Sequence, residues 1–302
     1  MSTNRDIDNF FLHGEFHIEL NFAQAELFNY LEEIRLVSAG VPYADLGIST
    51  RRHKSAPSVI AFTQSGVRTV GDSKVLADSS LTPQGSFAHL KLFGTMRSQD
   101  GASTRGIDSL IADINEAFQN ENIQGILLEA NTGGGESTAG QMLQGALADA
   151  PKPVVVYAHQ LASAGIMGTL PAAEIIASTK GSKFGSIGTF ISIDKRFAQW
   201  YQSNVTDIYA DKSVNKNKEF RDFLAGDFTS LKKSLNQSND RFLADVQAFR
   251  TLKGEASTIE HTLSGAMFEA GAAKSRGLID SIGGFQYALK RLSAHAQLQK
   301  AA

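Results

Sequence analysis

Apolar runs alternate with amphipathic stretches between residues 87 and 178, and this alternation is the feature that most constrains the fold. The four short runs are Phe87–Phe93, Gly125–Ala130, Val154–Ala158 and Ile175–Ser178. Such runs are typical of strands buried on both faces, and the stretches between them have helical spacing. Strands that alternate with helices predict an α/β fold, with a parallel sheet and helices on both of its faces.

Two turns made of small residues follow the second and third of these strands. Thr132–Gly135 contains three consecutive glycines, and Ala162–Gly165 carries Ser163 among small neighbours. Ligands of parallel α/β sheets bind beyond the carboxyl ends of the strands, which is where both turns would lie. A turn rich in backbone N–H donors beside a serine hydroxyl provides the parts of an acyl-transfer site. Ser163 is therefore the candidate nucleophile.

A serine nucleophile needs a base that removes its proton. None of the seven histidines closely follows the Ser163 turn, and His159, four residues before the serine, has no assured path to the hydroxyl. The other candidate is a lysine whose pKa is lowered by burial, because a neutral amine can accept the proton. Lys212, Lys216 and Lys218 lie in one polar segment, where at least two of them must simply be solvated.

The composition excludes several classes of function. The 302 residues, 42% of them hydrophobic, suffice for one or two domains with a real core. A net charge of −2 gives no electrostatic footprint for nucleic acid. The absence of cysteine excludes disulfides, thiolate zinc sites and cysteine nucleophiles. His13 and His17 have a spacing that suits two ligands on one helix face but lack further partners, so we expect neither a metal nor a cofactor.

The hydropathy pattern predicts no membrane segment. No apolar run reaches the roughly 20 residues needed to cross a bilayer, and the first residues lack a signal-peptide pattern. We therefore expect a cytoplasmic protein without a membrane anchor.

Two regions are predicted along the chain. Residues 1–55 should form an N-terminal helical extension, because phenylalanines and leucines recur there at partly helical spacing. This region ends at the basic cluster Arg51–Lys54, and residues 56–302 should form the main domain. Beyond residue 178 we expect strands at 190–193 and 205–209, and helices at about 195–202, 229–252 and from 285 onward.

Four segments, in this order, resemble the signal peptide peptidase A-like serine peptidases. They are Asn131–Gly135, Ala162–Gly165, Phe184–Gly188 and Gly277–Asp280 followed by Gly283. The first segment lacks the proline of the family's turn. The Ser-Ala-Gly order of the second is more similar to the phage head-maturation branch than to many membrane-bound members. The resemblance covers roughly residues 87–290 and implies a ClpP/crotonase-like fold for the main domain.

The resemblance also implies a Ser/Lys catalytic dyad. Ser163 would be the nucleophile, and the base would be a lysine well downstream. Lys216 is favoured by its distance along the chain and by the asparagine that follows it, with Lys212 and Lys218 as the alternatives.

The same resemblance assigns the oxyanion hole to backbone N–H groups of Gly134 or Gly135 and of Ala164. It implies polypeptide substrates and a ring-shaped homo-oligomer. The apolar residues of the segment 184–193, together with the N-terminal phenylalanines, are candidates for the contacts between chains.

Three functions remain open at this point. The first is a phage capsid-maturation protease that cleaves scaffold and capsid proteins in the host cytoplasm or the procapsid, or a bacterial cytoplasmic peptidase that degrades signal-peptide remnants. The second is a crotonase-like acyl-CoA enzyme, which needs no serine nucleophile. The third is a non-catalytic relative with a structural role, which would follow if no lysine could approach Ser163.

Overall fold

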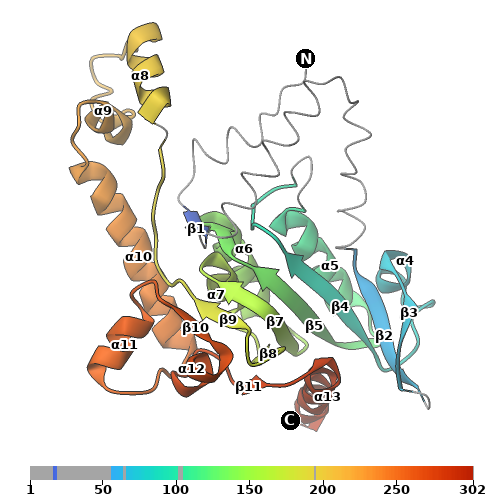
Figure 1. Ribbon diagram of the computed structural model, residues 1–302. Coiled ribbons are helices and arrows are strands. Elements are labelled where there is room, and N and C mark those ends of the chain that lie inside the picture. The colour runs from blue at the N-terminus through green and yellow to red at the C-terminus, as the bar shows by residue number, and fades with distance from the viewer. Residues whose placement is uncertain (1–15, 19–55, 64–65, 101–104, 194, 302) are drawn as a thin grey trace, which may run out of the picture.

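The computed structural model describes residues 16–18, 56–63, 66–100, 105–193 and 195–301 (Figure 1). Most of the expected N-terminal extension, including His13 and the cluster Arg51–Lys54, lies outside the described residues. Of that region only β1 (Phe16–Ile18) is described.

The predicted parallel sheet is present at the centre of the molecule. Its strands run in the order β10-β9-β7-β5-β4-β2-β3, with β8 and β11 attached beside β7. The strands β4, β5 and β7 are mutually parallel, and β7 pairs with β8 along its first half and with β9 at its end. The bounds are β2 (Ser58–Thr63), β3 (Gly66–Gly71), β4 (Ser86–Phe93), β5 (Ile123–Thr132), β7 (Val154–Ala162), β8 (Glu174–Ala177), β9 (Lys183–Gly185), β10 (Met267–Glu269) and β11 (Ser281–Ile282).

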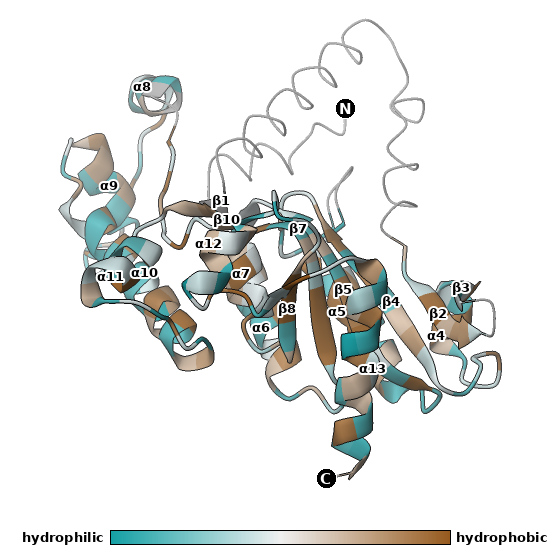
Figure 2. Ribbon diagram, turned by 60° about the horizontal axis from the view of Figure 1, so that its bottom comes forward, coloured by the Kyte–Doolittle hydropathy of each residue, from teal (hydrophilic) through white to brown (hydrophobic). Residues whose placement is uncertain are grey.

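Helices cover both faces of this sheet, as the sequence predicts. On one face α5 (Ile107–Gln119), α6 (Ser137–Ala148) and α7 (Ala164–Thr169) pack against side chains such as Ile126 and Val156. On the other face α13 (Phe285–Ala301) packs against the alternate side chains, including Leu127 and Val155. The apolar runs are continuous because each central strand is buried on both faces (Figure 2).

The remaining helices lie at the two ends of the sheet. At one end a small helix packs beside β2 and β3, and at the other a group of helices follows β9. Their bounds are α4 (Ser73–Ala77), α8 (Lys195–Asn204), α9 (Lys218–Leu224), α10 (Thr229–Phe249), α11 (Ala256–Thr262) and α12 (Ala270–Ser275). The helices α8 and α9 and the first part of α10 project away from the sheet, and we call this part the arm (Figure 1).

Two strand predictions in this region are wrong. Residues 205–209 form no strand, because they lie in the arm with no sheet edge beside them, and Ile208 is 94% exposed. Residues 190–193 also lie outside the named strands. The sheet is extended earlier, by β9, and the chain leaves it at Ser186, whose φ is 53°.

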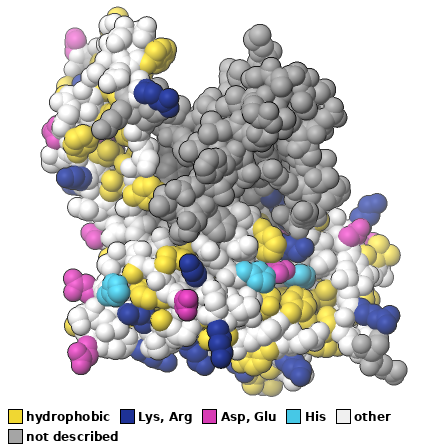
Figure 3. Space-filling model, viewed as in Figure 1, with side chains coloured by type: hydrophobic (Ala, Val, Ile, Leu, Met, Phe, Trp, Pro, Cys, Tyr) yellow, Lys and Arg dark blue, Asp and Glu magenta, His cyan; other side chains and the backbone are white. Residues whose placement is uncertain are grey.

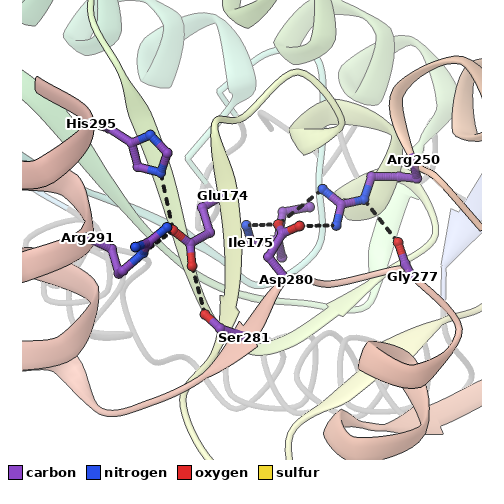
Figure 4. A network of polar contacts seen from close by, with 8 residues as sticks. All are labelled: Glu174, Ile175, Arg250, Gly277, Asp280, Ser281, Arg291 and His295. Carbon is purple, nitrogen blue, oxygen red and sulfur yellow. Dashed lines mark hydrogen bonds and ion pairs between the residues drawn. The ribbon is translucent and has the colours of Figure 1, made fainter. Parts of the chain in front are cut away.

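The Gly277–Asp280 motif holds the last segment of the chain against the sheet (Figure 4). The carboxylate of Asp280 accepts a hydrogen bond from the backbone N–H of Ile175 at 2.7 Å. It also accepts hydrogen bonds from both terminal nitrogens of the Arg250 guanidinium, at 3.1 and 2.8 Å. Gly277 has a φ of 80°, and a side chain there would meet the carbonyl oxygen of Thr251 at 2.2 Å. The motif therefore fixes the last segment of the chain against β8.

A second carboxylate also binds the last segment of the chain to the sheet. The side chain of Glu174, at the start of β8, accepts hydrogen bonds from Ser281 (2.8 Å) and Arg291 (2.6 Å) and contacts His295 (3.2 Å) (Figure 4). Because Glu174 is 4% exposed, its charge requires these partners. Together the two carboxylates bind α13 and the segment before it to the sheet.

Candidate active site

Ser163 occupies a sharp turn between β7 and α7. Its φ and ψ of 55° and −119° lie outside the regions that non-glycine residues favour, and such strain persists only where the surroundings impose it. Its N–H donates to the carbonyl of Gly185 at 2.9 Å, and its own carbonyl accepts the N–H of Met167 at 3.1 Å. These two hydrogen bonds hold the backbone of the serine turn in place, and Ser163 is 1% exposed.

Small residues allow α7 to approach its neighbours very closely. A side chain at Gly165 would meet the Cγ2 atom of Thr132 at 2.6 Å, and one at Gly140 would meet the carbonyl oxygen of Ala164 at 3.0 Å. The first contact joins the serine turn to the end of β5, and the second joins α7 to α6. Glycine at positions 140 and 165 therefore permits the close packing around the serine turn.

The glycine-rich turn lies beside the serine turn. Its final residues form the short strand β6 (Gly134–Glu136), which is clamped to the residue Met96. The N–H of Met96 donates to Gly134 (2.8 Å), and the N–H of Glu136 donates to Met96 (2.9 Å). A side chain at Gly135 would lie 2.1 Å from the carbonyl oxygen of Met96, so only glycine fits. The N–H of Gly134 donates to the hydroxyl of Thr132 at 3.0 Å.

The parallel pairing of β5 with β7 explains why the two turns meet. Thr132 is opposite Leu161 in the register, so the two strands end together at one edge of the sheet. This is the arrangement expected from the sequence.

The candidate lysines lie elsewhere in the chain. Lys212, Lys216 and Lys218 are all exposed, in or next to the turn that precedes α9. Lys218 forms an ion pair with Asp222 at 2.6 Å. Lys216 lies in the turn directly before α9, and Figures 1 and 2 both show α9 on the arm, well separated from α7, the helix that follows Ser163.

Both ring nitrogens of His159 have hydrogen-bond partners other than Ser163. Its Nε2 contacts a carboxylate oxygen of Glu129 at 2.8 Å, and its Nδ1 contacts the hydroxyl of Ser178 at 2.9 Å. The other oxygen of Glu129 contacts Nε2 of His89 at 2.9 Å. The hydrogen bond from His89 does most to lower the pKa of Glu129, to about 2, against the effect of burial. This cluster was not predicted, although its polar residues interrupt strands that are otherwise apolar.

The charged groups of the described residues form no metal site. Among these residues, no three or more His, Asp or Glu side chains lie together so that they could hold a metal ion. On the face shown in Figure 3, Lys and Arg side chains are scattered among Asp and Glu. None of the described helices is both long enough and apolar enough to cross a membrane.

The features above define an α/β protein with a parallel sheet, whose serine and glycine turns meet at the carboxyl edge of the strands. The profile of peptidase family S49 matches residues 146–299, slightly more than half of the chain, and the chain belongs to that family. The matched region includes both Ser163 and Lys216.

A curated relative is known from Methanocaldococcus jannaschii, where it is named as a putative protease. It is 29% identical over 192 residues, which cover 61% of this chain. The chain spans 60% of the length of that relative.

Solved structures with a related arrangement are more distant. A ClpP1 variant from Listeria monocytogenes has a TM-score of 0.41 and 13% identity, covering 67% of this chain and 94% of its own. The membrane-bound stomatin-specific protease 1510-N has a TM-score of 0.41 and 16% identity, with coverages of 68% and 81%. An enoyl-CoA hydratase/isomerase family protein from Silicibacter pomeroyi has a TM-score of 0.42 and 14% identity, with coverages of 73% and 81%.

Proposed function

We propose that the chain is a serine endopeptidase that uses Ser163 as its nucleophile. The observation that carries this proposal is the strained turn at Ser163, held beside the glycine-rich turn in a chain of peptidase family S49. Such a turn fixes the hydroxyl next to backbone donors, which is what acyl transfer requires. A crotonase-like acyl-CoA enzyme would not need a serine held in this way.

In the proposed mechanism the Ser163 Oγ attacks the scissile carbonyl carbon while the neutral amine of Lys216 takes the hydroxyl proton. The resulting oxyanion accepts the N–H groups of Gly135 and Ala164. We prefer Gly135 to Gly134, because the N–H of Gly134 already donates to Thr132. The ammonium of Lys216 then protonates the leaving amine, and water hydrolyses the acyl-enzyme. Losing one oxyanion donor typically costs about 10²–10³ in rate.

The position of Lys216 supports a site shared between chains. A lysine acts as a base near neutral pH when it is buried, but Lys216 is exposed within one chain. The arm around it exposes large apolar side chains, and such surfaces mark interfaces. They are Trp200 (57% exposed), Ile208 (94%), Val214 (67%) and Phe228 (48%). Docking of the arm on another chain would bury these side chains and bring Lys216 to that chain's Ser163.

The apolar segment 184–193 contributes less to assembly than the sequence suggested. Phe184 and Ile187 are completely buried within the chain and belong to its own core. Phe190, which is 41% exposed, and the partly exposed Ile191 and Ile193 are the apolar members of the segment that could contact another chain. We therefore place the main contact of the proposed ring on the arm.

For the substrate we favour polypeptides of a phage capsid and its scaffold, on the basis of the Ser-Ala-Gly order at the nucleophile turn. Degradation of signal-peptide remnants in a bacterial cytoplasm is the second candidate. Genes for portal and capsid proteins beside this gene would favour the first, and their absence would favour the second.

The proposed activity is tested with a fluorophosphonate probe and a fluorogenic peptide. We expect the probe to label Ser163 and to stop peptide hydrolysis in proportion to labelling. Hydrolysis that continues after complete labelling would contradict the assignment, and a chain that neither reacts nor hydrolyses would have the structural role instead.

A further inference from the structure

The glycine-rich strand β6 has a partner from the far N-terminal part of the chain. Phe16, His17 and Ile18 of β1 are antiparallel to it, opposite Glu136, Gly135 and Gly134 respectively. These two strands form a small sheet of their own, separate from the central sheet. β1 also contacts α7, the helix that begins directly after Ser163.

The backbone bonds of β6 indicate which of its groups can face β1. The N–H of Gly134 donates to Thr132, and the N–H of Glu136 donates to Met96. That leaves the N–H of Gly135, opposite His17 in the register, as the donor on β6 available to β1. Residues that face each other in antiparallel strands alternate between hydrogen-bonded and non-hydrogen-bonded pairs. Gly135 and His17 would be the hydrogen-bonded pair of this ladder, with a non-hydrogen-bonded pair on either side.

This N–H is also the one that the proposed mechanism assigns to the oxyanion. A substrate peptide would add to the same edge as an extended strand, with main-chain hydrogen bonds giving the affinity. One edge of β6 cannot pair with two strands at once. The position of β1 therefore competes with a substrate, and the 1% exposure of Ser163 agrees with a site that is closed to one.

We propose that the edge of β6 opposite Met96 is a binding site for an extended peptide and that the chain's own strand β1 occupies it. A substrate enters only when β1 leaves. The inhibition of hydrolysis by β1 rests on the proposed peptidase function, whereas the binding of a peptide strand to β6 is independent of catalysis. Because β1 is tethered to the domain it pairs with, its effective concentration at the edge is high, and a free peptide must compete with it.

The test replaces His17 and Ile18 with proline in the full-length chain. Proline has no N–H, and adjacent residues of a strand point their N–H groups to opposite sides, so the pair removes one ladder hydrogen bond in either register. The matched control, Asn9→Pro with Phe10→Pro, places two prolines in the N-terminal region outside β1. The catalytic candidates are unchanged in both variants.

The first two measurements do not depend on activity and use a Ser163→Ala background. Hydrogen exchange at the Gly135 amide should be faster in the His17/Ile18 variant than in the parent and the control. A fluorescent peptide with the sequence of residues 12–22 should bind that variant about tenfold or more tightly than the other two. Unchanged exchange, or equal binding to all three proteins, would overturn the proposal.

The third measurement is peptide hydrolysis with Ser163 intact. We expect kcat/KM to rise about tenfold in the His17/Ile18 variant, mainly through a lower KM. A fall in kcat would show that β1 supports the glycine turn, which would overturn the inhibitory role. If no protein hydrolyses peptide while exchange and binding change as expected, the proposed function fails and the peptide site on β6 stands.

Discussion

The backbone N–H of Ser163 donates to the carbonyl oxygen of Gly185 at 2.9 Å, so the candidate nucleophile is held in place by the segment Phe184–Gly188. Gly185 has a φ of 131°, and a side chain there would lie 2.2 Å from the carbonyl oxygen of Ala266. The Gly-Ser-Ile-Gly motif therefore has a physical role, because it supplies a strand end on which the serine turn rests.

Replacing Gly185 with alanine should impair catalysis more than it impairs folding. The new methyl group must push β9 away from Ala266, and Ser163 follows because the two are hydrogen-bonded. A displacement of about 1 Å can cost about 100-fold in rate. We expect a fall of this size in kcat/KM, measured with a fluorogenic peptide, with a folded protein by circular dichroism. Gly271→Ala is the control, because a side chain there meets nothing within 4 Å, and a loss equal to the control's would contradict the argument.

Ser163→Ala and Ser163→Gly should both abolish hydrolysis but differ in stability. Both remove the attacking oxygen, whereas only glycine relieves the strain of a positive φ, which typically costs about 1–3 kcal/mol. The glycine variant should therefore be more stable than the alanine variant by about 1 kcal/mol in denaturant unfolding. Turnover retained by either variant would exclude Ser163 as the nucleophile.

Lys216→Ala should abolish activity, and mixing it with Ser163→Ala should restore part of it. If the arm of one chain serves the serine of another, a mixed oligomer contains sites with an intact Ser163 and an intact Lys216. Lys212→Ala and Lys218→Ala are the matched controls and should be nearly silent, since the exposed pair of Lys218 with Asp222 contributes little.

Two results would change this assignment. An inactive Lys212→Ala or Lys218→Ala variant would move the base to that lysine. A mixture that stays inactive, although light scattering shows mixed oligomers, would show that both residues act within one chain. Dilution of the wild-type protein should lower its specific activity as the oligomer dissociates, and a fully active monomer would contradict the shared site.

Glu129→Gln should lower the free energy of unfolding at neutral pH, and it should make that free energy depend less on pH under acidic conditions. The pKa of Glu129 is lowered in the folded chain to about 2 from an ordinary 4.5, chiefly by the hydrogen bond from His89. Its contribution is therefore complete above about pH 4.5 and is lost as the pH falls toward 2. Because the site is partly solvated, we expect a loss of about 1 kcal/mol at pH 7. Urea unfolding from pH 7 to 3 measures this, with the exposed Glu121→Gln as control, and equal pH profiles would contradict it.

The sequence predicts the central part of the fold well and its periphery poorly. Runs such as Val154–Val156 are buried on both faces, so local composition alone identifies them as strands. The segment 205–209 (Val-Thr-Asp-Ile-Tyr) also contains several residue types that favour strands, but it has no neighbouring sheet edge, and Ile208 is left exposed. A strand depends on a partner that local sequence does not reveal.

The candidate site shows the same limit. The turn at Ser163 could be predicted because its small residues and its place after a strand are local properties. The separation of Lys216 from Ser163 could not, since it depends on where the arm points. The pairing of β1 with β6 is equally hidden, because three residues carry no periodicity.

The arm has a mechanical consequence. Phe242 and Val246 anchor the second half of α10 in the core, so its projecting part, Thr229 to Ser238, is about 15 Å long, with α9 and the Lys216 turn near its outer end. A tilt of about 15° at the base of this part moves its tip by about 4 Å, which exceeds the tolerance of a proton transfer. One chain alone would hold the amine too loosely for catalysis. Docking of the tip on another chain would hold the Lys216 amine in place, so under the proposed mechanism peptide bonds would be cleaved only after the chains have assembled.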